Sequence, residues 1–382
     1  MDTSKPLPLL NGLTPAAFMR RHWQKKPLLI RQAVPDAGGL VDRAGLFALA
    51  GQDGVESRLI VRQGAQWTLR HGPFARRALP RLGQAGWTVL VQGVDLHLDA
   101  AHELLARFRF VPDARLDDLM ISWASDGGGV GPHVDSYDVF LLQLQGRRRW
   151  RIAPLEDPEL VAGAPLRILR HFTPQEAWTL EPGDMLYLPP GWAHDGAADG
   201  ECMTASIGFR APARLALGRE VLQYLLDAAE VPEGDVLYQD RAQPATLTPG
   251  RMPDRLLAFA TGAAERLLRE PRAMARALGE VMSEPKPNVW FDAGRPLAAG
   301  QGVRLDRRSR MLYDDDHVFL NGESFRASGR DARLMRTLAD QRRLAGAELV
   351  RLSDNARELL DQWLEAGWLQ PEPPAHDDAR GS

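Results

Sequence analysis

The first 210 residues consist largely of short apolar runs separated by turns rich in glycine and proline. Runs of this kind are typical of β-strands, and the turns come too often to allow long helices. Many short strands with such punctuation predict an antiparallel barrel or sandwich. The predicted strands are 27–31, 67–69, 87–91, 119–123, 139–144, 149–152, 185–188 and 203–209, after a short helix at 15–23.

From residue 211 the pattern changes from strand to helix. Leucine and alanine recur every three or four residues in 214–229, 251–269 and 272–282. This spacing predicts a helical bundle, which is a common place for contact between subunits. A proline-rich break at 283–287 ends the bundle, because proline disfavours helix on both sides.

The last third of the chain is predicted to form a small mixed domain. Asn321-Gly322 between two short apolar runs is a strong hairpin signal, because both positions tolerate positive φ. Helices are expected at 331–343 and from a capping Ser353 to Gly367. Two helices with small strands resemble a winged-helix fold, and the tail from 371 is expected to be disordered.

The composition excludes several classes of protein. With 44% hydrophobic and 25% charged residues the chain is neither wholly disordered nor a membrane protein, and no apolar run is long enough to span a bilayer. A net charge of −3 gives no global attraction to nucleic acid, so any such contact would have to be local. One cysteine, Cys202, and a start without signal-peptide features predict a cytoplasmic protein.

Two separated motifs predict a metal site. His133 and Asp135, at i and i+2, project from the same face of an extended strand and can reach one ion. The Pro-Pro-Gly turn at 189–191 is expected to deliver His194 at the mouth of the barrel. Two imidazoles and a carboxylate suit a facial Fe(II) site, which leaves three positions open for cosubstrate and dioxygen. The alternative is a buried histidine whose ring is satisfied by the backbone.

An arginine-rich strand follows the Gly146 turn. Alternation places Arg148 on the same face as Trp150 and Ile152, and places its arginine neighbours on the other face. A guanidinium on an apolar face needs an anionic partner, and a dicarboxylate cosubstrate would supply one through a bidentate pair. The alternative is a solvated basic edge.

The chain resembles the JmjC branch of the 2-oxoglutarate-dependent oxygenases in three features. These are the His133/Asp135 pair, an arginine 15 residues after His133, and the distal His194. The runs 18–30, 131–150, 189–194 and 206–212 are similar to the bacterial ribosomal oxygenases, which hydroxylate an arginine at C3 in the sixteenth L-series protein of the large ribosomal subunit. The resemblance therefore implies that a ribosomal protein of the large subunit is the substrate and partner of this chain.

The resemblance also implies an α+β fold in several parts. These are a double-stranded β-helix (jelly-roll, cupin) JmjC domain at 1–210, a helical dimerisation domain at 211–287, a winged-helix-like domain at 288–372 and a disordered tail at 373–382. It implies Fe(II), 2-oxoglutarate and dioxygen as cofactor and cosubstrates. The metal ligands would be His133, Asp135 and His194, and Arg148 would bind the distal carboxylate of 2-oxoglutarate.

Residues for substrate recognition are less sharply indicated. Asp126 lies seven residues before His133, and a carboxylate there could grip a guanidinium, as the resemblance also suggests. Tyr137 and Ser206 are expected to line the pocket. The alternative for Asp126 is that it only shapes the glycine-rich loop.

Three other functions remain open at this stage. The same metal chemistry would serve a hydroxylase of another side chain, such as histidine, or a demethylase. A winged helix is also compatible with a non-enzymatic DNA-binding regulator. However, residues 291–382 contain 16 acidic and 14 basic side chains, and a phosphate-reading helix should be positively charged. Nucleic-acid binding through this domain is therefore the weaker hypothesis.

Overall fold

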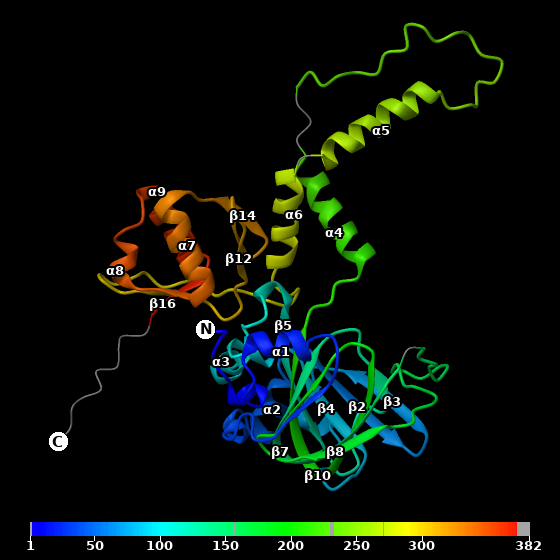
Figure 1. Ribbon diagram of the computed structural model, residues 1–382, viewed down its shortest axis with the longest axis vertical. Helices are drawn as coiled ribbons and strands as arrows, with labels where there is room; N and C mark the ends of the chain where they lie inside the picture. The colour runs from blue at the N-terminus through cyan, green and yellow to red at the C-terminus, as the bar shows by residue number, and fades with distance from the viewer. Residues whose placement is uncertain (1, 156, 230–232, 270, 373–382) are drawn as a thin grey trace. The chain divides into compact units, whose positions relative to one another are not determined.

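The computed structural model describes residues 2–155, 157–229, 233–269 and 271–372. Two compact units make up the chain, Met1–Ala211 and Pro212–Ser382, and they divide beside the predicted boundary at residue 210 (Figure 1). The boundary at 287 stays a prediction, and the predicted tail at 373–382 lies outside the described residues. Among the helices in the described ranges, none has the length and apolar character needed to cross a membrane.

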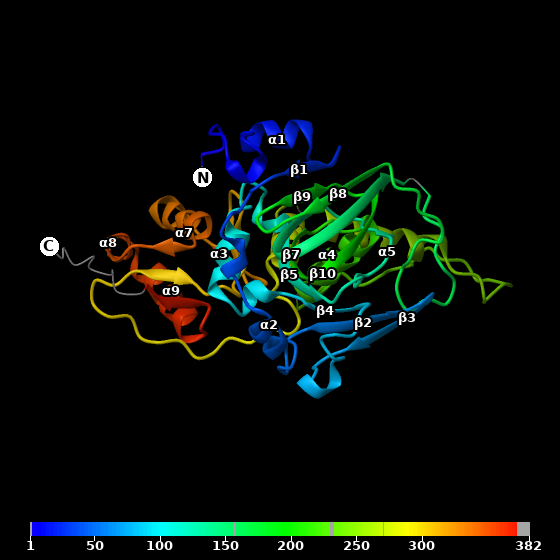
Figure 2. The same cartoon turned by 90° about the horizontal axis from the view of Figure 1, so that it is seen from below.

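A ten-stranded antiparallel sheet forms the body of the first unit (Figure 2). Its strands are β1 (Leu28–Ile30), β2 (Ser57–Gln63), β3 (Gln66–His71), β4 (Trp87–Val91), β5 (Leu116–Ala124), β6 (His133–Val134), β7 (Val139–Pro154), β8 (Glu176–Leu180), β9 (Met185–Leu188) and β10 (Trp192–Phe209). They follow the order β1-β9-β7-β10-β5-β4-β2-β3, with β6 paired to β10 and β8 paired to β7. The predicted antiparallel architecture is confirmed.

The two longest strands, β7 and β10, hold this sheet together. β7 pairs with β9 near its start and with β8 near its end, while β10 pairs first with β6 and then with β5. Their shared register shifts between Asp199 and Met203, close to Gly146. Gly146 has φ +63°, and a Cβ there would overlap the carbonyl oxygen of Glu201. Only glycine fits at this irregularity in the pairing of the two strands.

Helices and aromatic rings cover one face of the sheet. The longer helices are α1 (Pro15–Arg21), α2 (Arg43–Leu49) and α3 (Asp99–Ala106), and the 3-10 turns are η1 (Pro8–Leu10), η2 (Ala37–Gly39), η3 (Arg76–Ala78), η4 (Val94–Leu96) and η5 (Asp113–Arg115). Phe18 of α1 is fully buried, with its ring centroid 5.0 Å from that of Tyr187 and 5.5 Å from that of Phe140. This packing directs the other face of the strands toward the interior of the roll.

The sequence prediction missed part of this sheet. A strand was expected only at 203–209, whereas β10 begins at Trp192. Residues 195–200, Asp-Gly-Ala-Ala-Asp-Gly, have no apolar alternation that would mark a strand. Pairing with β7 from Trp192↔Pro154 to Asp199↔Arg147 holds them extended. The prediction also missed β2 and β8.

The second unit begins with three helices, α4 (Arg214–Asp227), α5 (Asp254–Leu268) and α6 (Pro271–Ser283), close to the predicted ranges. Val221 and Leu225 of α4 pack against Ala277 and Val281 of α6 in a small apolar cluster. In contrast, α5 buries none of its described side chains.

The winged-helix part contains two three-stranded sheets and three helices among the described residues. Its elements are β11 (Val303–Leu305), β12 (Met311–Tyr313), β13 (His317–Leu320), β14 (Glu323–Arg326), α7 (Gly329–Gln341), β15 (Arg343–Leu344), α8 (Gly346–Leu349), α9 (Asp354–Glu365) and β16 (Leu369–Pro371). Asn321 and Gly322 both have positive φ in the predicted hairpin between β13 and β14. Ser353 caps α9 by accepting a hydrogen bond from the Ala356 amide, as predicted.

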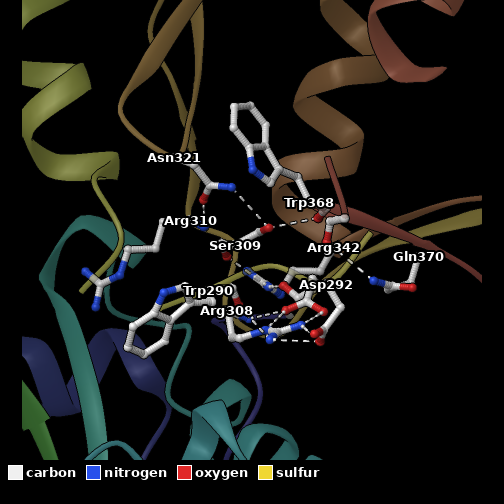
Figure 3. A network of polar contacts seen from close by, with 11 residues as sticks. Trp290, Asp292, Arg308, Ser309, Arg310, Asn321, Arg342, Trp368 and Gln370 are labelled. Carbon is white, nitrogen blue, oxygen red and sulfur yellow. Dashed lines mark hydrogen bonds and ion pairs between the residues drawn. The ribbon is translucent and has the colours of Figure 1, made fainter. Parts of the chain in front are cut away.

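A polar network fixes the turn between β11 and β12 (Figure 3). The Arg308 guanidinium donates from Nε to Asp306 Oδ1 at 2.8 Å and from Nη1 to the Trp290 carbonyl at 2.7 Å. Ser309 Oγ donates to the Trp368 carbonyl at 2.8 Å. These bonds satisfy the charges and the turn carbonyls internally, so the network stabilises the fold.

Candidate metal centre

Strand pairing brings the three predicted ligands together. The register of β6 against β10 places His133 opposite His194, and Asp135 directly follows β6. Ligand atoms of all three residues lie within 4.8 Å of one another. Asp135 Oδ1 is 3.9 Å from His133 Nε2, and Asp135 Oδ2 is 3.6 Å from His194 Nε2. Two nitrogens and a carboxylate oxygen on one side of a small space are the donor set of a facial Fe(II) site.

Both imidazoles are oriented by their other nitrogen. His133 Nδ1 lies 2.9 Å from the Gly131 carbonyl oxygen, and His194 Nδ1 lies 3.0 Å from the Trp192 carbonyl oxygen. A protonated Nδ1 donates to such an oxygen and leaves the lone pair of Nε2 facing the cluster. Burial and the neighbouring His133 lower the pKa of His194 to about 4, so this ring is neutral at physiological pH, as a metal ligand must be.

Arg148 is a buried cation without an anionic partner among the described residues. It is 3% exposed, and its Nη atoms donate to Ser122 Oγ at 3.1 Å, Thr204 Oγ1 at 3.3 Å and the Gly196 carbonyl at 3.2 Å. Its Nε has no hydrogen-bond partner within the described part of the chain. Desolvation lowers the pKa of this guanidinium below its usual range. A buried, incompletely satisfied guanidinium is costly, and a carboxylate ligand would relieve that cost.

The cation lies on the same side of the strands as the ligand cluster. The Trp150 ring is 5.1 Å from the Arg148 guanidinium carbon and 5.9 Å from the His194 ring. Arg148 also reaches the carbonyl of Gly196, which is two residues, or roughly 7 Å, along β10 from His194. The predicted alternation of β7 is confirmed, because Arg148, Trp150 and Ile152 are buried while Arg147, Arg149 and Arg151 are exposed. This spacing fits a five-carbon diacid held between metal and guanidinium.

The interior face of β5 contributes residues that the sequence prediction missed. Asp118, Met120 and Ser122 alternate with Leu119 and Ile121, which belong to the aromatic core, so they face the roll interior. Asp118 is 3% exposed and accepts hydrogen bonds from Gln92 Nε2 at 2.8 Å and the Gly93 amide at 3.1 Å. Two adjacent aspartates, Asp117 and Asp118, at the start of a mostly apolar strand were the available signal.

The predicted pocket residues Tyr137 and Ser206 lie near this face. Ser206 pairs with Met120 across β10 and β5 and is half-buried. The pKa of Tyr137 is raised by desolvation and by the negative charges of Asp135 and Asp118. Tyr137 is therefore near both the Asp135 and the Asp118 carboxylates.

Asp126 is the predicted site residue that the structure does not bring to this centre. Its carboxylate is exposed and accepts a hydrogen bond from the Gly200 amide at 2.9 Å. The Asp126 carboxylate reaches Gly200, six residues beyond His194 on β10, whereas His133 pairs with His194 itself. This geometry supports the alternative that Asp126 shapes the glycine-rich loop, and its role in substrate binding stays a prediction.

Comparison with known proteins agrees with this geometry. A JmjC domain model matches residues 103–217, and a ROXA-like winged-helix model matches residues 266–370. The Ribosomal protein uL16 3-hydroxylase of Escherichia coli (strain K12) is 35% identical over 333 residues, which cover 82% of this chain and 86% of that protein. The Probable ribosomal oxygenase of Haemophilus influenzae is 35% identical over 205 residues, which cover 52% of this chain and 50% of that protein.

Solved structures extend the similarity to both units. The X-ray structure of E. coli ycfD has a TM-score of 0.83 and 30% identity, covering 94% of this chain and 98% of that one. A structure of YcfD in complex with cobalt and 2-oxoglutarate has a TM-score of 0.77 and 30% identity, with 94% and 99% of the chains covered. The antiparallel roll, the winged helix and the extent of the identity together show that this chain belongs to the JmjC-domain ribosomal oxygenases.

Proposed function

We propose that the protein is an Fe(II)- and 2-oxoglutarate-dependent hydroxylase that acts on C3 of an arginine in ribosomal protein uL16. The observation that supports this most strongly is the combination of the His133/Asp135/His194 cluster with Arg148 on one interior face. The relative named a uL16 3-hydroxylase supports the choice of substrate. We place the reaction in the cytoplasm, because bacterial ribosomal proteins are made and assembled in that compartment.

The chemistry divides between the bound groups and the chain. Fe(II) with 2-oxoglutarate and dioxygen supplies the oxidation, in which one oxygen atom enters a C–H bond of the substrate and the other enters succinate as CO2 leaves. The protein orients the neutral imidazole nitrogens of His133 and His194 and the Asp135 carboxylate so that all three can bind one metal ion. Arg148 binds the distal carboxylate of the cosubstrate and so sets its direction. Trp150 packs between these groups and excludes water.

Within this function, the substrate guanidinium is assigned to Asp118 in place of Asp126. Asp118 is a buried carboxylate whose Oδ1 lies 3.7 Å from a Cβ built on Gly208, and a carboxylate binds a guanidinium through charge-assisted hydrogen bonds. Tyr137, whose pKa is raised by desolvation and by the charges of Asp135 and Asp118, is assigned as the aromatic face that packs on the arginine side chain.

Asp118→Asn is expected to lower kcat/KM for an arginyl uL16 peptide on the order of 100-fold, because a buried hydrogen bond to a charged group contributes about 3 kcal/mol. Mass spectrometry of the peptide measures the loss of the +16 product. Decarboxylation of 2-oxoglutarate without peptide tests whether the metal centre is intact. Asp126→Asn, the matched control, is expected to retain activity within about threefold, since the exposed Asp126 serves a turn. The reverse pattern would return the substrate role to Asp126.

A second candidate activity follows from more distant relatives. The chain is 27% identical over 196 residues to an Aedes aegypti protein named bifunctional lysine-specific demethylase and histidyl-hydroxylase NO66. The buried Asp118 favours a cationic side chain over a neutral imidazole. Mass spectrometry of ribosomal proteins treated with enzyme, Fe(II), 2-oxoglutarate and oxygen separates these activities, because hydroxylation adds 16 mass units, demethylation removes 14, and fragment ions place the added oxygen on arginine or histidine.

We also propose that the helical segment pairs with a second copy of the chain. Leu222 and Leu226 on α4 are 44% and 59% exposed, and Leu257 and Phe259 on α5 are 58% and 41% exposed. Such apolar helix faces usually bury against another helix.

The double variant Leu222→Glu/Leu226→Glu is expected to convert a dimer of about twice 42.3 kDa into a monomer, as measured by light scattering after size-exclusion chromatography. Two exposed polar residues of the same helix provide the control, Arg219→Glu/Gln223→Glu, which should stay dimeric. A monomeric wild-type protein at micromolar concentration would rule out this proposal.

A further inference from the structure

A side chain outside the predicted site, Gln92, links the Asp118 carboxylate to a cation. Gln92 directly follows β4, and its Nε2 donates to Asp118 Oδ2 at 2.8 Å. Its Oε1 accepts a hydrogen bond from Arg58 Nη2 at 3.0 Å. The donor end of the amide thus meets the anion and its acceptor end meets the cation, which is the one arrangement that suits both partners. A carboxylate on β5 is in this way connected to a guanidinium on β2.

The Arg58 side chain belongs to the interior face of the roll. Across the sheet Arg58 pairs with Leu90, and Leu90 pairs with Ser122, which binds Arg148. Residues directly opposite one another on neighbouring strands share a face, so Arg58 projects to the same side as Ser122. Its Nη2 also lies 3.7 Å from the sulfur of Met120, another residue of this face. The link therefore lies inside the roll and not on its outer surface.

The charge of Arg58 lies near the groups assigned to the substrate arginine. Desolvation and the negative charges of Asp135 and Asp118 raise the pKa of Tyr137, and the positive charge of Arg58 opposes that rise. A cation at this place repels a cationic substrate side chain and would by itself weaken its binding. Arg58 therefore requires a role that outweighs the repulsion, and its contact with Gln92 supplies one.

The Asp118 carboxylate is oriented through one of its oxygens. Oδ2 accepts hydrogen bonds from Gln92 Nε2 at 2.8 Å and from the Gly93 amide at 3.1 Å. Two donors on one oxygen restrict the rotation of the carboxylate, and they direct Oδ1 toward Gly208 on β10. Of the two donors only Gln92 is a side chain, and Arg58 fixes which end of its amide faces Asp118. The hydrogen bond from Arg58 also polarises the amide, so that its N–H donates more strongly.

We propose that Gln92 and Arg58 are positioning residues, which hold the Asp118 carboxylate in the orientation that receives the guanidinium of the substrate arginine. The inference rests on the proposed function, because it needs an arginyl substrate at Asp118. A carboxylate that is already oriented loses less freedom when the substrate binds, and binding is correspondingly tighter. The simpler explanation is that the link only satisfies polar groups inside the roll and ties β2 and β4 to β5.

Gln92→Met is expected to raise KM for an arginyl uL16 peptide about tenfold, because it removes a charge-assisted hydrogen bond that orients Asp118. The change should fall mainly on KM, since a misdirected carboxylate weakens the ground state and the transition state alike. In a double-mutant cycle, Gln92→Met should change KM less than about twofold when Asp118→Asn is already present. A link that serves only the fold would give the same factor in both backgrounds, and that result would overturn the inference.

Arg58→Met should raise the same KM about fivefold, because the amide loses the partner that orders it. Arg58→Lys should recover part of this loss, since an ammonium group can still donate to Gln92 Oε1. Two variants serve as matched controls and should keep the wild-type KM. Arg62→Met removes the same charge from an exposed position four residues along β2, and Gln223→Met breaks an exposed hydrogen bond of 2.9 Å to Asp227 on α4.

Folding and the proposed function are checked separately. Circular dichroism reports on the folding of each variant, and decarboxylation of 2-oxoglutarate without peptide reports on its metal centre. Gln92→Glu keeps the length of the side chain but, when ionised, cannot donate, so it should reproduce the effect of Gln92→Met. A wild-type protein that hydroxylates only a histidyl peptide would overturn the proposed function and this inference together. An active wild type with unchanged KM in Gln92→Met and Arg58→Met would overturn this inference alone.

Discussion

Asp135→Asn is expected to abolish hydroxylation, with at least about a thousand-fold loss in kcat, because the metal supplies several kcal/mol of transition-state stabilisation. The carboxylate is the only anionic donor in the cluster of three, and it lies within 4 Å of both imidazole Nε2 atoms. An amide oxygen keeps the shape but loses the charge that offsets Fe(II). Anaerobic titration with Co(II), followed by visible absorption, should show correspondingly weaker metal binding.

Asp199→Asn is the matched control for this change. Asp199 lies on β10, five residues after His194, and pairs with Arg147 where both side chains are more than half exposed. Exposed pairs contribute at most about 1 kcal/mol, so this variant should bind metal and turn over as the wild type does. Normal activity of Asp135→Asn with tight metal binding would mean that the cluster is not the reactive centre.

Arg148→Met is expected to raise KM for 2-oxoglutarate on the order of 100-fold, since a charge-assisted hydrogen-bonded pair contributes about 3 kcal/mol. kcat at saturating 2-oxoglutarate should fall much less, because the metal ligands are untouched. The wild-type protein should also gain thermal stability when 2-oxoglutarate and metal are added, as the ligand compensates the buried charge. The variant should gain far less at the same concentration.

Arg149→Met provides the comparison, because Arg149 is the next residue along β7 but projects from the exposed face. It removes the same charge and should leave both KM and the thermal shift unchanged. If the two variants behaved alike, the effect would come from the strand's overall charge, and Arg148 would not be the carboxylate anchor.

The metal ligands could be predicted from the sequence because their geometry is local. A strand directs residues i and i+2 to one face whatever surrounds it, so His133 and Asp135 had to share a side. The same rule separated Arg148 from its arginine neighbours. The distal His194 was predictable only in part, since its proline-glycine turn indicated a bend but not the partner strand.

The extent of β10 could not be predicted in this way. Its first half, with Asp195, Gly196 and Gly200, has the composition of a loop, and only hydrogen bonds to β7 keep it extended. A strand that is held extended mainly by its partner strand need not contain residues with high β-propensity, because β-propensity depends on the neighbours that a strand packs against.

The sequence alone determined which residues carry the chemistry, since alternation along a strand and turn residues act over a few positions. Only the tertiary structure decided which carboxylates face the interior of the roll. The core packing of Leu119 and Ile121 turns Asp118 inward, while a hydrogen bond from the Gly200 amide holds Asp126 at the surface. Whether a side chain points into the barrel depends on which face of its strand is buried in the core. Contacts between segments far apart in the chain decide which face that is.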